Sequence, residues 1–105
     1  MAKYKYLVTT QFMKDVKLCV KRGKPMEALK SVIEQLLEFG QLPAQYKPHK
    51  LSGPLKGLWE CHIQPDWLLI WEQKDDVLTM LMTQVNPFHR HRQLLLPLPS
   101  AWRHP

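Results

Sequence analysis

The fold is decided by residues 58–72, which read LWECHIQPDWLLIWE. The first six of these residues alternate in character, so in a strand Glu60 and His62 share one face and apolar side chains take the other. Residues 64–66 are typical of a tight turn. Residues 67–72 are so apolar that we predict a central strand covered on both faces. Because strands joined by so short a turn are antiparallel, this stretch predicts the middle of an antiparallel sheet.

The sequence on either side predicts an α+β domain. Residues 77–83 form the next expected strand, after a turn. Towards the N-terminus, residues 4–8 alternate like a half-buried strand. Residues 11–22 and 25–39 carry apolar side chains at helical spacing, and a glycine follows each run. The expected order is β-α-α-β-β-β, a mainly antiparallel sheet with a helical hairpin packed on one face.

Two segments fall outside these periodic elements. Residues 41–57 form a long connection rich in proline and glycine, and long ordered loops are more often functional than idle. This connection contains basic residues and no acidic residue. From Gln84 onward the pattern degrades. We expect one domain over residues 1–92 and a C-terminal extension over residues 93–105 that is packed or partly mobile.

Composition restricts the partners. The chain of 105 residues has 15 Lys and Arg against nine Asp and Glu, a formal charge of +6. Such a surplus suits a polyanionic partner, although solubility alone also favours net charge. No apolar run approaches the ~20 residues of a membrane-spanning helix, and no signal peptide is evident, so we expect a cytoplasmic protein with no membrane partner. Cys19 and Cys61 lie within apolar patterns and are expected to be reduced core residues.

Histidines are the main candidates for chemistry. His49 lies in the basic loop, His62 on a strand with Asp66 just beyond the turn, and His89 and His91 in a basic tail. These residues lack any recognised metal-ligand spacing, so we expect no metal and no cofactor. Burial disfavours the cysteines as nucleophiles. The residue types permit metal-free RNA cleavage, which needs an acid, a base and cations for the phosphorane, but they do not select it.

Two adjoining stretches of sequence indicate a family more specifically than the residue types do. Residues 46–53 read YKPHKLSG and residues 55–71 read LKGLWECHIQPDWLLIW. They resemble the YafQ branch of the RelE-like bacterial toxins, whose pattern is approximately YKDHxLxGxxKGxRxxHIxPDWLLIY. The predicted order of strands and helices agrees with the RelE-like fold of this family, so the resemblance covers about residues 1–90.

This resemblance implies the toxin of a type II toxin–antitoxin system. Such toxins are ribosome-dependent endoribonucleases that cut mRNA in the A site. A co-expressed acidic antitoxin neutralises them, and they reach operator DNA only through the antitoxin complex. The alternative is a RelE-fold protein that binds RNA, the ribosome or an antitoxin and cuts weakly or not at all. A structural adaptor without RNA contact is disfavoured by the +6 charge and the histidines.

The resemblance also implies site residues. His49 and His62 are assigned to acid–base work, and Asp66 to orienting a histidine or binding substrate. Trp67 either stacks on RNA or packs in the core. An ungapped match puts Asn86 where the family has a third histidine, so His89 or His91 has to replace it or the reaction relies on His49 and His62. The further expected RNA-binding residues are Lys47, Lys50, Lys56, Asn86, Phe88, Arg90 and Arg92.

Overall fold

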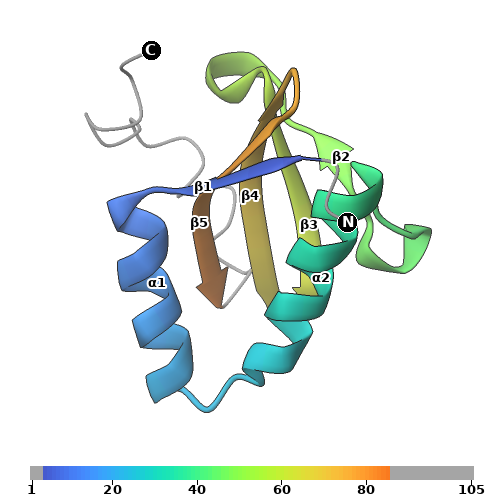
Figure 1. Ribbon diagram of the computed structural model, residues 1–105. Helices are drawn as coiled ribbons and strands as arrows, with labels where there is room; N and C mark the ends of the chain where they lie inside the picture. Colours follow the sequence, from blue (N-terminus) through green and yellow to red (C-terminus); the bar gives the residue numbers. More distant parts are fainter. Residues whose placement is uncertain (1–3, 86–105) are drawn as a thin grey trace.

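The computed structural model describes residues 4–85, which form a five-stranded sheet with two helices on one face (Figure 1). The predicted order of strands and helices is confirmed, with one short strand added. Within these residues no helix is long and apolar enough to cross a membrane. The elements are β1 (Lys5–Val8), α1 (Thr10–Lys21), α2 (Met26–Phe39), β2 (His49–Lys50), β3 (Leu58–Gln64), β4 (Trp67–Lys74) and β5 (Val77–Val85), with 3₁₀ turns at Ala44–Tyr46 and Gly53–Leu55.

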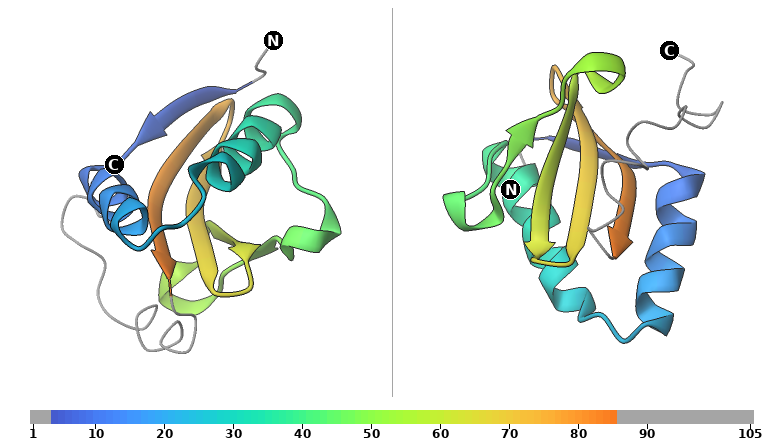
Figure 2. Two further views of the ribbon diagram at one scale, coloured as in Figure 1. Left: turned by 90° about the horizontal axis from the view of Figure 1, so that it is seen from below. Right: turned by 180° about the vertical axis from the view of Figure 1, so that it is seen from behind.

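The strands lie in the order β1-β5-β4-β3-β2. The last three strands in the chain, β3 to β5, form the predicted antiparallel meander. β1 joins β5 in parallel, and β2 pairs antiparallel with β3 at the other edge. Figure 2 shows that α1 and α2 lie on the same side of this sheet, as the predicted hairpin requires. The opposite face of the sheet is therefore not covered by these helices.

The prediction that β1 is half-buried is wrong. All four of its residues are exposed, and Tyr6, Leu7 and Val8 are each more than a third exposed. The reason is position: β1 is an edge strand beyond β5, whereas the helices pack over the central strands. Alternation along a strand shows which side chains share a face, but not whether that face is covered.

Each helix is stabilised at one end by a local interaction. The Thr9 hydroxyl accepts a hydrogen bond from the backbone N–H of Phe12, 2.9 Å away, and so caps the start of α1. α2 ends at Gly40, whose φ of +69° is the left-handed conformation that glycine adopts without strain. The Tyr4 ring occupies the place that a Cβ would take there. No other residue type fits at this position without moving Tyr4.

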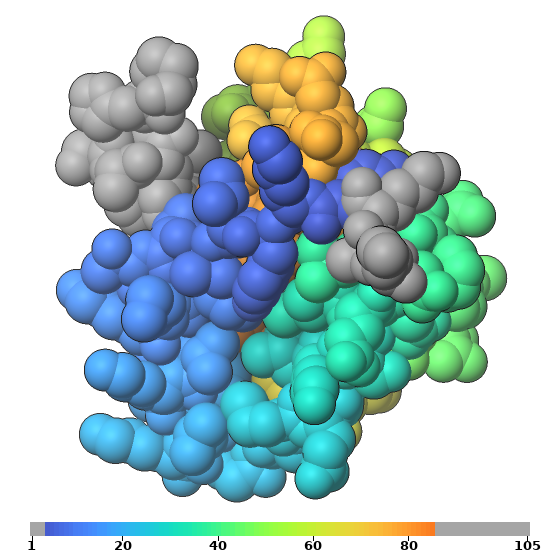
Figure 3. All heavy atoms as spheres, viewed as in Figure 1, coloured from blue at the N-terminus to red at the C-terminus, as the bar shows by residue number. Residues whose placement is uncertain are grey.

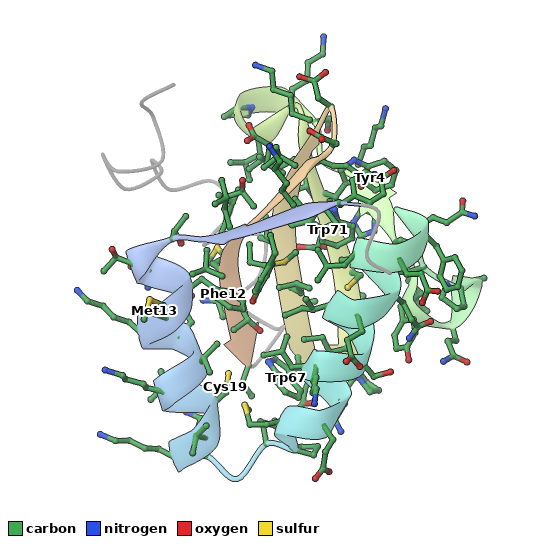
Figure 4. All side chains as sticks on the ribbon, viewed as in Figure 1. Tyr4, Phe12, Met13, Cys19, Trp67 and Trp71 are labelled. Atoms are coloured by element: carbon green, nitrogen blue, oxygen red, sulfur yellow. The ribbon has the colours of Figure 1, made fainter. Side chains whose placement is uncertain are left out.

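The main core lies between the helices and the sheet. Figure 4 shows Phe12, Cys19, Trp67 and Trp71 between α1, α2 and the strands, and Figure 3 shows the helices in front of the sheet. Burial raises the pKa of the Cys19 thiol, and it raises that of Cys61 to about 12. Both cysteines are free and buried, which confirms that they are core residues unsuited to nucleophilic chemistry.

Candidate active site

Two of the expected histidines, His49 and His62, lie on the sheet face that points away from the helices. Cys61 and Ile63 of β3 belong to the core under the helices, so alternation places Glu60 and His62 on the opposite face. β2 sets His49 directly opposite Glu60 in the antiparallel register. Residues in direct register share a face, so His49, Glu60 and His62 form one group.

Both ring nitrogens of His49 lie close to an oxygen atom. Its Nε2 lies 3.0 Å from Oε1 of Glu60, and its Nδ1 lies 2.9 Å from the carbonyl oxygen of Lys47. The Glu60 side chain is 1% exposed, whereas that of His49 is 45% exposed. The imidazole therefore has Nε2 beside a buried carboxylate and Nδ1 beside the Lys47 carbonyl, with nearly half of the side chain exposed to solvent.

The loop before β2 reaches this geometry through an unusual backbone. Lys47 follows the first 3₁₀ turn with φ 49° and ψ 50°, the left-handed region. This conformation costs a non-glycine residue about 1–2 kcal/mol. Pro48 adds to the constraint, because a residue before proline favours extended geometry. The turn places the Lys47 carbonyl beside His49 and lets the chain enter β2.

His62 lines a pocket of about 330 Å³ beside the edge of β3. β2 pairs only with Trp59 and Glu60, so the end of β3 is free to form a pocket wall with the neighbouring 3₁₀ turn. A volume of this order is typical of small-ligand sites. The pocket brings His62 and Lys47 together, and its lining residues are Gln45, Tyr46, Lys47, His62, Ile63, Gln64 and Pro65.

Asp66 lies in the turn between β3 and β4. Both of its carboxylate oxygens accept hydrogen bonds from Lys24 Nζ, at 2.9 and 2.8 Å, and Lys24 also reaches the Gln64 amide oxygen. The hydrogen bond from Lys24 lowers the pKa of Asp66, which is about half exposed. The Lys24–Asp66 ion pair connects the link between the two helices with the turn between β3 and β4. The expected role of Asp66 towards a histidine or substrate stays a prediction.

Two expected RNA-binding lysines lie away from the histidines. Lys50 follows His49 in β2, so its side chain takes the opposite face, where its Nζ lies 5.5 Å from the centre of the Trp59 ring. Lys56 is exposed just before β3 begins, at the far end of that strand from His62. Among the three expected loop lysines, Lys47 is the one that lines the pocket.

Of the two roles expected for Trp67, stacking on RNA or packing in the core, the structure supports packing in the core. Trp67 is fully buried, and its indole Nε1 donates a 2.8 Å hydrogen bond to the Thr83 hydroxyl. That hydroxyl in turn donates to the Leu68 carbonyl oxygen. No face of the ring is open to a base, so the structure supports the alternative of core packing.

Several other expectations fall outside the described residues. These are the catalytic role of His89 or His91, the RNA contacts of Asn86, Phe88, Arg90 and Arg92, and the boundary between residues 1–92 and 93–105. Within residues 4–85, no three His, Cys, Asp or Glu side chains are grouped to hold a metal ion. The expectation that the site works without metal or cofactor stays a prediction.

The sequence did not reveal two partners, Glu60 for His49 and Lys24 for Asp66. A glutamate on the same strand face as a histidine, within an apolar stretch, was the one available signal for Glu60. Nothing marked Lys24, which is 42 residues from Asp66 in the chain. An imidazole beside a buried carboxylate, a second imidazole and a lysine are the types of group that proton transfer at a phosphodiester requires.

Comparisons with known proteins match the chain to a family of bacterial toxins. The family model described as "Bacterial toxin of type II toxin-antitoxin system, YafQ" matches residues 4–95. The mRNA interferase toxin YafQ of Escherichia coli strain K12 is 45% identical over 69 residues, which cover 65% of this chain and 75% of that protein.

Solved structures give the same result over more of the chain. YafQ from E. coli superposes with a TM-score of 0.76 at 35% identity, covering 89% of this chain and 99% of that one. The E. coli DinJ–YafQ toxin–antitoxin complex matches with a TM-score of 0.75 at 36% identity, covering 90% and 99%. The α+β fold expected from the sequence is confirmed by these neighbours.

Proposed function

The chain belongs to the YafQ family of type II toxin–antitoxin toxins, and from this premise we propose that it is an mRNA interferase acting on the ribosome. It is an endoribonuclease that inhibits translation by cutting mRNA in the A site. The observation that carries this function is the placement of His62 and Lys47 on one pocket, with His49 on the same sheet face.

The proposed chemistry uses the ribose 2′-hydroxyl as the nucleophile. The 2′-oxygen attacks the adjacent phosphorus, and the bond from phosphorus to the 5′-oxygen breaks. The products are a 2′,3′-cyclic phosphate and a 5′-hydroxyl. His49 and His62 supply the acid and base, because histidine gains and loses a proton near physiological pH. Lys47 supplies positive charge for the phosphorane oxygens.

The proposed partners follow from the same assignment. An antitoxin partner is supported by the DinJ–YafQ complex among the neighbours. We expect that antitoxin to be acidic and co-expressed, because the chain carries a formal charge of +6. mRNA and the ribosomal A site are the expected RNA partners, and operator DNA is contacted only through the antitoxin complex. The toxin acts in the cytoplasm, where translation takes place.

The test is induced expression followed by primer extension on a reporter mRNA. We expect growth arrest, new 5′ ends within translated codons, and loss of both when the cognate antitoxin is co-expressed. Ribosome binding without new 5′ ends would instead favour the alternative, a RelE-fold binding protein with little nuclease activity.

The pocket lysine is expected to set part of the salt dependence of binding. Lys47→Ala should weaken association with ribosome-bound mRNA and reduce the slope of log K against log salt by about one unit, because one phosphate contact is lost. Lys74→Ala is the matched control, since this exposed lysine ends β4 far from the pocket. Binding measured from low to physiological salt concentration shows whether the slope differs between wild type and Lys47→Ala. Equal slopes for wild type and Lys47→Ala would remove Lys47 from the RNA interface.

A further inference from the structure

We propose that Trp59 and Lys50 form a second RNA contact, in which an unpaired base stacks on the outer face of the Trp59 ring and Lys50 binds a neighbouring phosphate. This inference rests on the proposed function and extends it, because it adds a binding site on the sheet face opposite the histidines. It also gives a role to Lys50, an expected RNA-binding residue that lies away from the pocket.

Three side chains stand in a row at one edge of the sheet. Trp59 of β3 is paired with Trp71 of β4 on one side and with Lys50 of β2, the outermost strand, on the other. Residues in direct register share a face, so the three side chains leave the sheet on the same side. Because Trp59 and Trp71 pack in the core under the helices, this is the helix side, opposite His49 and His62.

The inner face of the Trp59 ring rests on a buried partner. The Trp59 and Trp71 rings are stacked, with centres 6.0 Å apart and an angle of 11° between their planes. Trp71 is 1% exposed, and its indole Nε1 donates a 3.3 Å hydrogen bond to Oε1 of Gln73. Gln73 in turn donates to the Gly40 carbonyl at the end of α2. The Trp59 ring is therefore held in place before RNA arrives, which lowers the entropy lost on binding.

The outer face of the ring is turned towards β2 and carries Lys50. The Nζ atom of Lys50 lies 5.5 Å from the centre of the Trp59 ring, and Lys50 is exposed. An ammonium group over an aromatic ring at an exposed site is a weak contact. A base can therefore take its place on the ring, and the displaced ammonium group stays within reach of the phosphate next to that base.

The charge around this ring suits a polyanion. Residues 41–57, which lead into β2 and β3, contain three lysines and no acidic residue. Lys56 is exposed three residues before Trp59, so a second expected RNA-binding lysine lies near the ring in the chain. Aromatic rings combined with basic side chains bind single-stranded nucleic acid with little preference for sequence, because every base has a flat face.

Residue 59 also differs from the YafQ pattern, which has arginine at this position where the chain has tryptophan. The two residue types differ in charge, but both present a flat face on which an RNA base can stack. Lys50 stands at a position that the pattern leaves open, and it supplies the positive charge that Trp59 lacks. The pair thus keeps both properties of an arginine, which core packing alone does not explain.

Strand β2 connects this contact with the histidines. His49 and Lys50 are its two consecutive residues, so their side chains point to opposite faces of the sheet. An RNA strand that crosses the sheet edge at β2 meets His49 on one face and Lys50 with Trp59 on the other. The stacked base therefore belongs to a nucleotide close to the bond that is cut. Its stacking contributes to affinity and not to proton transfer.

The experiment separates RNA binding from cleavage. Trp59→Leu keeps an apolar side chain over Trp71 but removes the ring, and it should weaken binding to ribosome-bound mRNA roughly 5–100-fold, the usual effect of losing one stacked base. Trp59→Phe should recover much of this affinity. Both variants should reach the wild-type rate of single-turnover cleavage at saturation. Tyr6→Leu is the matched control, since it removes an exposed ring from β1 at the other edge of the sheet and should bind like wild type.

Salt dependence distinguishes the two members of the pair. Lys50→Met should reduce the slope of log K against log salt by about one unit, because one phosphate contact is lost. Trp59→Leu should weaken binding with an unchanged slope, because the ring carries no charge. A Lys50→Met protein with the wild-type slope would overturn the phosphate contact.

The unpaired base can come from mRNA or from ribosomal RNA, and abasic mRNA distinguishes these sources. With mRNA that lacks bases around the cut site, the difference in affinity between wild type and Trp59→Leu disappears if the stacked base belongs to mRNA. The difference persists if the base belongs to ribosomal RNA. Either result supports stacking on Trp59.

A folded Trp59→Leu protein that binds programmed ribosomes as tightly as wild type would overturn the proposal. If this variant does not fold, ¹⁹F NMR of wild-type protein labelled with 5-fluorotryptophan replaces it. The Trp59 signal, assigned by its absence from Trp59→Phe, should shift when oligoadenylate is added, whereas the signal of the buried Trp67 should not. An unshifted Trp59 signal would also overturn the proposal. If RNA stacks on Trp59 but the wild-type protein cuts no mRNA, the proposed function fails and the second RNA contact stands.

Discussion

Replacing His62 by alanine is expected to reduce mRNA cleavage about 10²–10⁴-fold, the usual effect of removing a general acid or base. His62 lies on the pocket wall beside Lys47, and it shares a sheet face with His49. Its removal leaves the binding surface largely in place but takes away one of the two histidines proposed as acid and base. In cells the same change should relieve the growth arrest caused by expression of the chain.

The comparison needs a variant that alters the pocket without removing a proton-transfer group. Gln45→Ala serves this purpose, because Gln45 lines the same pocket and is exposed. Single-turnover cleavage of ribosome-bound mRNA is measured for wild type and both variants, after circular dichroism has shown each to be folded. Cleavage by a folded His62→Ala protein at the wild-type rate would remove His62 from the mechanism.

Trp67→Ala is expected to lower the free energy of unfolding by about 3–5 kcal/mol, the range for truncating a buried aromatic side chain. Trp67 is fully buried in the core beneath the helices, and its indole is hydrogen-bonded to Thr83. The whole free energy of unfolding of a small domain is only about 5–15 kcal/mol, so this variant should be close to unfolding at 37 °C. Urea denaturation followed by circular dichroism measures the change.

Trp67→Phe separates packing from RNA contact. It keeps most of the ring volume and loses the hydrogen bond to Thr83, so it should be destabilised less than Trp67→Ala and should cut mRNA at close to the wild-type rate. Trp59→Ala is a useful comparison, because Trp59 is only partly buried and stacks on Trp71 with ring centres 6.0 Å apart. A stable Trp67→Phe protein that had lost cleavage would restore the RNA-stacking interpretation.

The candidate active site shows which side-chain positions residue patterns predict and which they do not. Alternation alone put Glu60 and His62 on one face of a strand, and the structure confirms that placement through the register with β4. The position of His49 was not predictable in the same way. A two-residue strand is too short to show a period, so the sequence assigned residues 49 and 50 to a loop. Its pairing with β3 is what brings His49 onto Glu60.

The sequence by itself determined the types and order of the main elements. Hydrophobic periods of two and 3.6 residues, together with Gly23 and Gly40 after the helices, are local signals that need no knowledge of distant residues. The same stretch carried the family resemblance, and with it the proposed activity. Local chemistry also predicted that Cys19 and Cys61 are core residues rather than nucleophiles.

Only the tertiary structure decided which faces are covered and which distant residues meet. β1 alternates like a covered strand but lies exposed at an edge, because the helices pack over the central strands instead. Trp67 is buried in the core, and Asp66 is bound by Lys24 from the link between the helices. Contacts between segments far apart in the chain depend on how sheet and helices pack, and no local period encodes that packing.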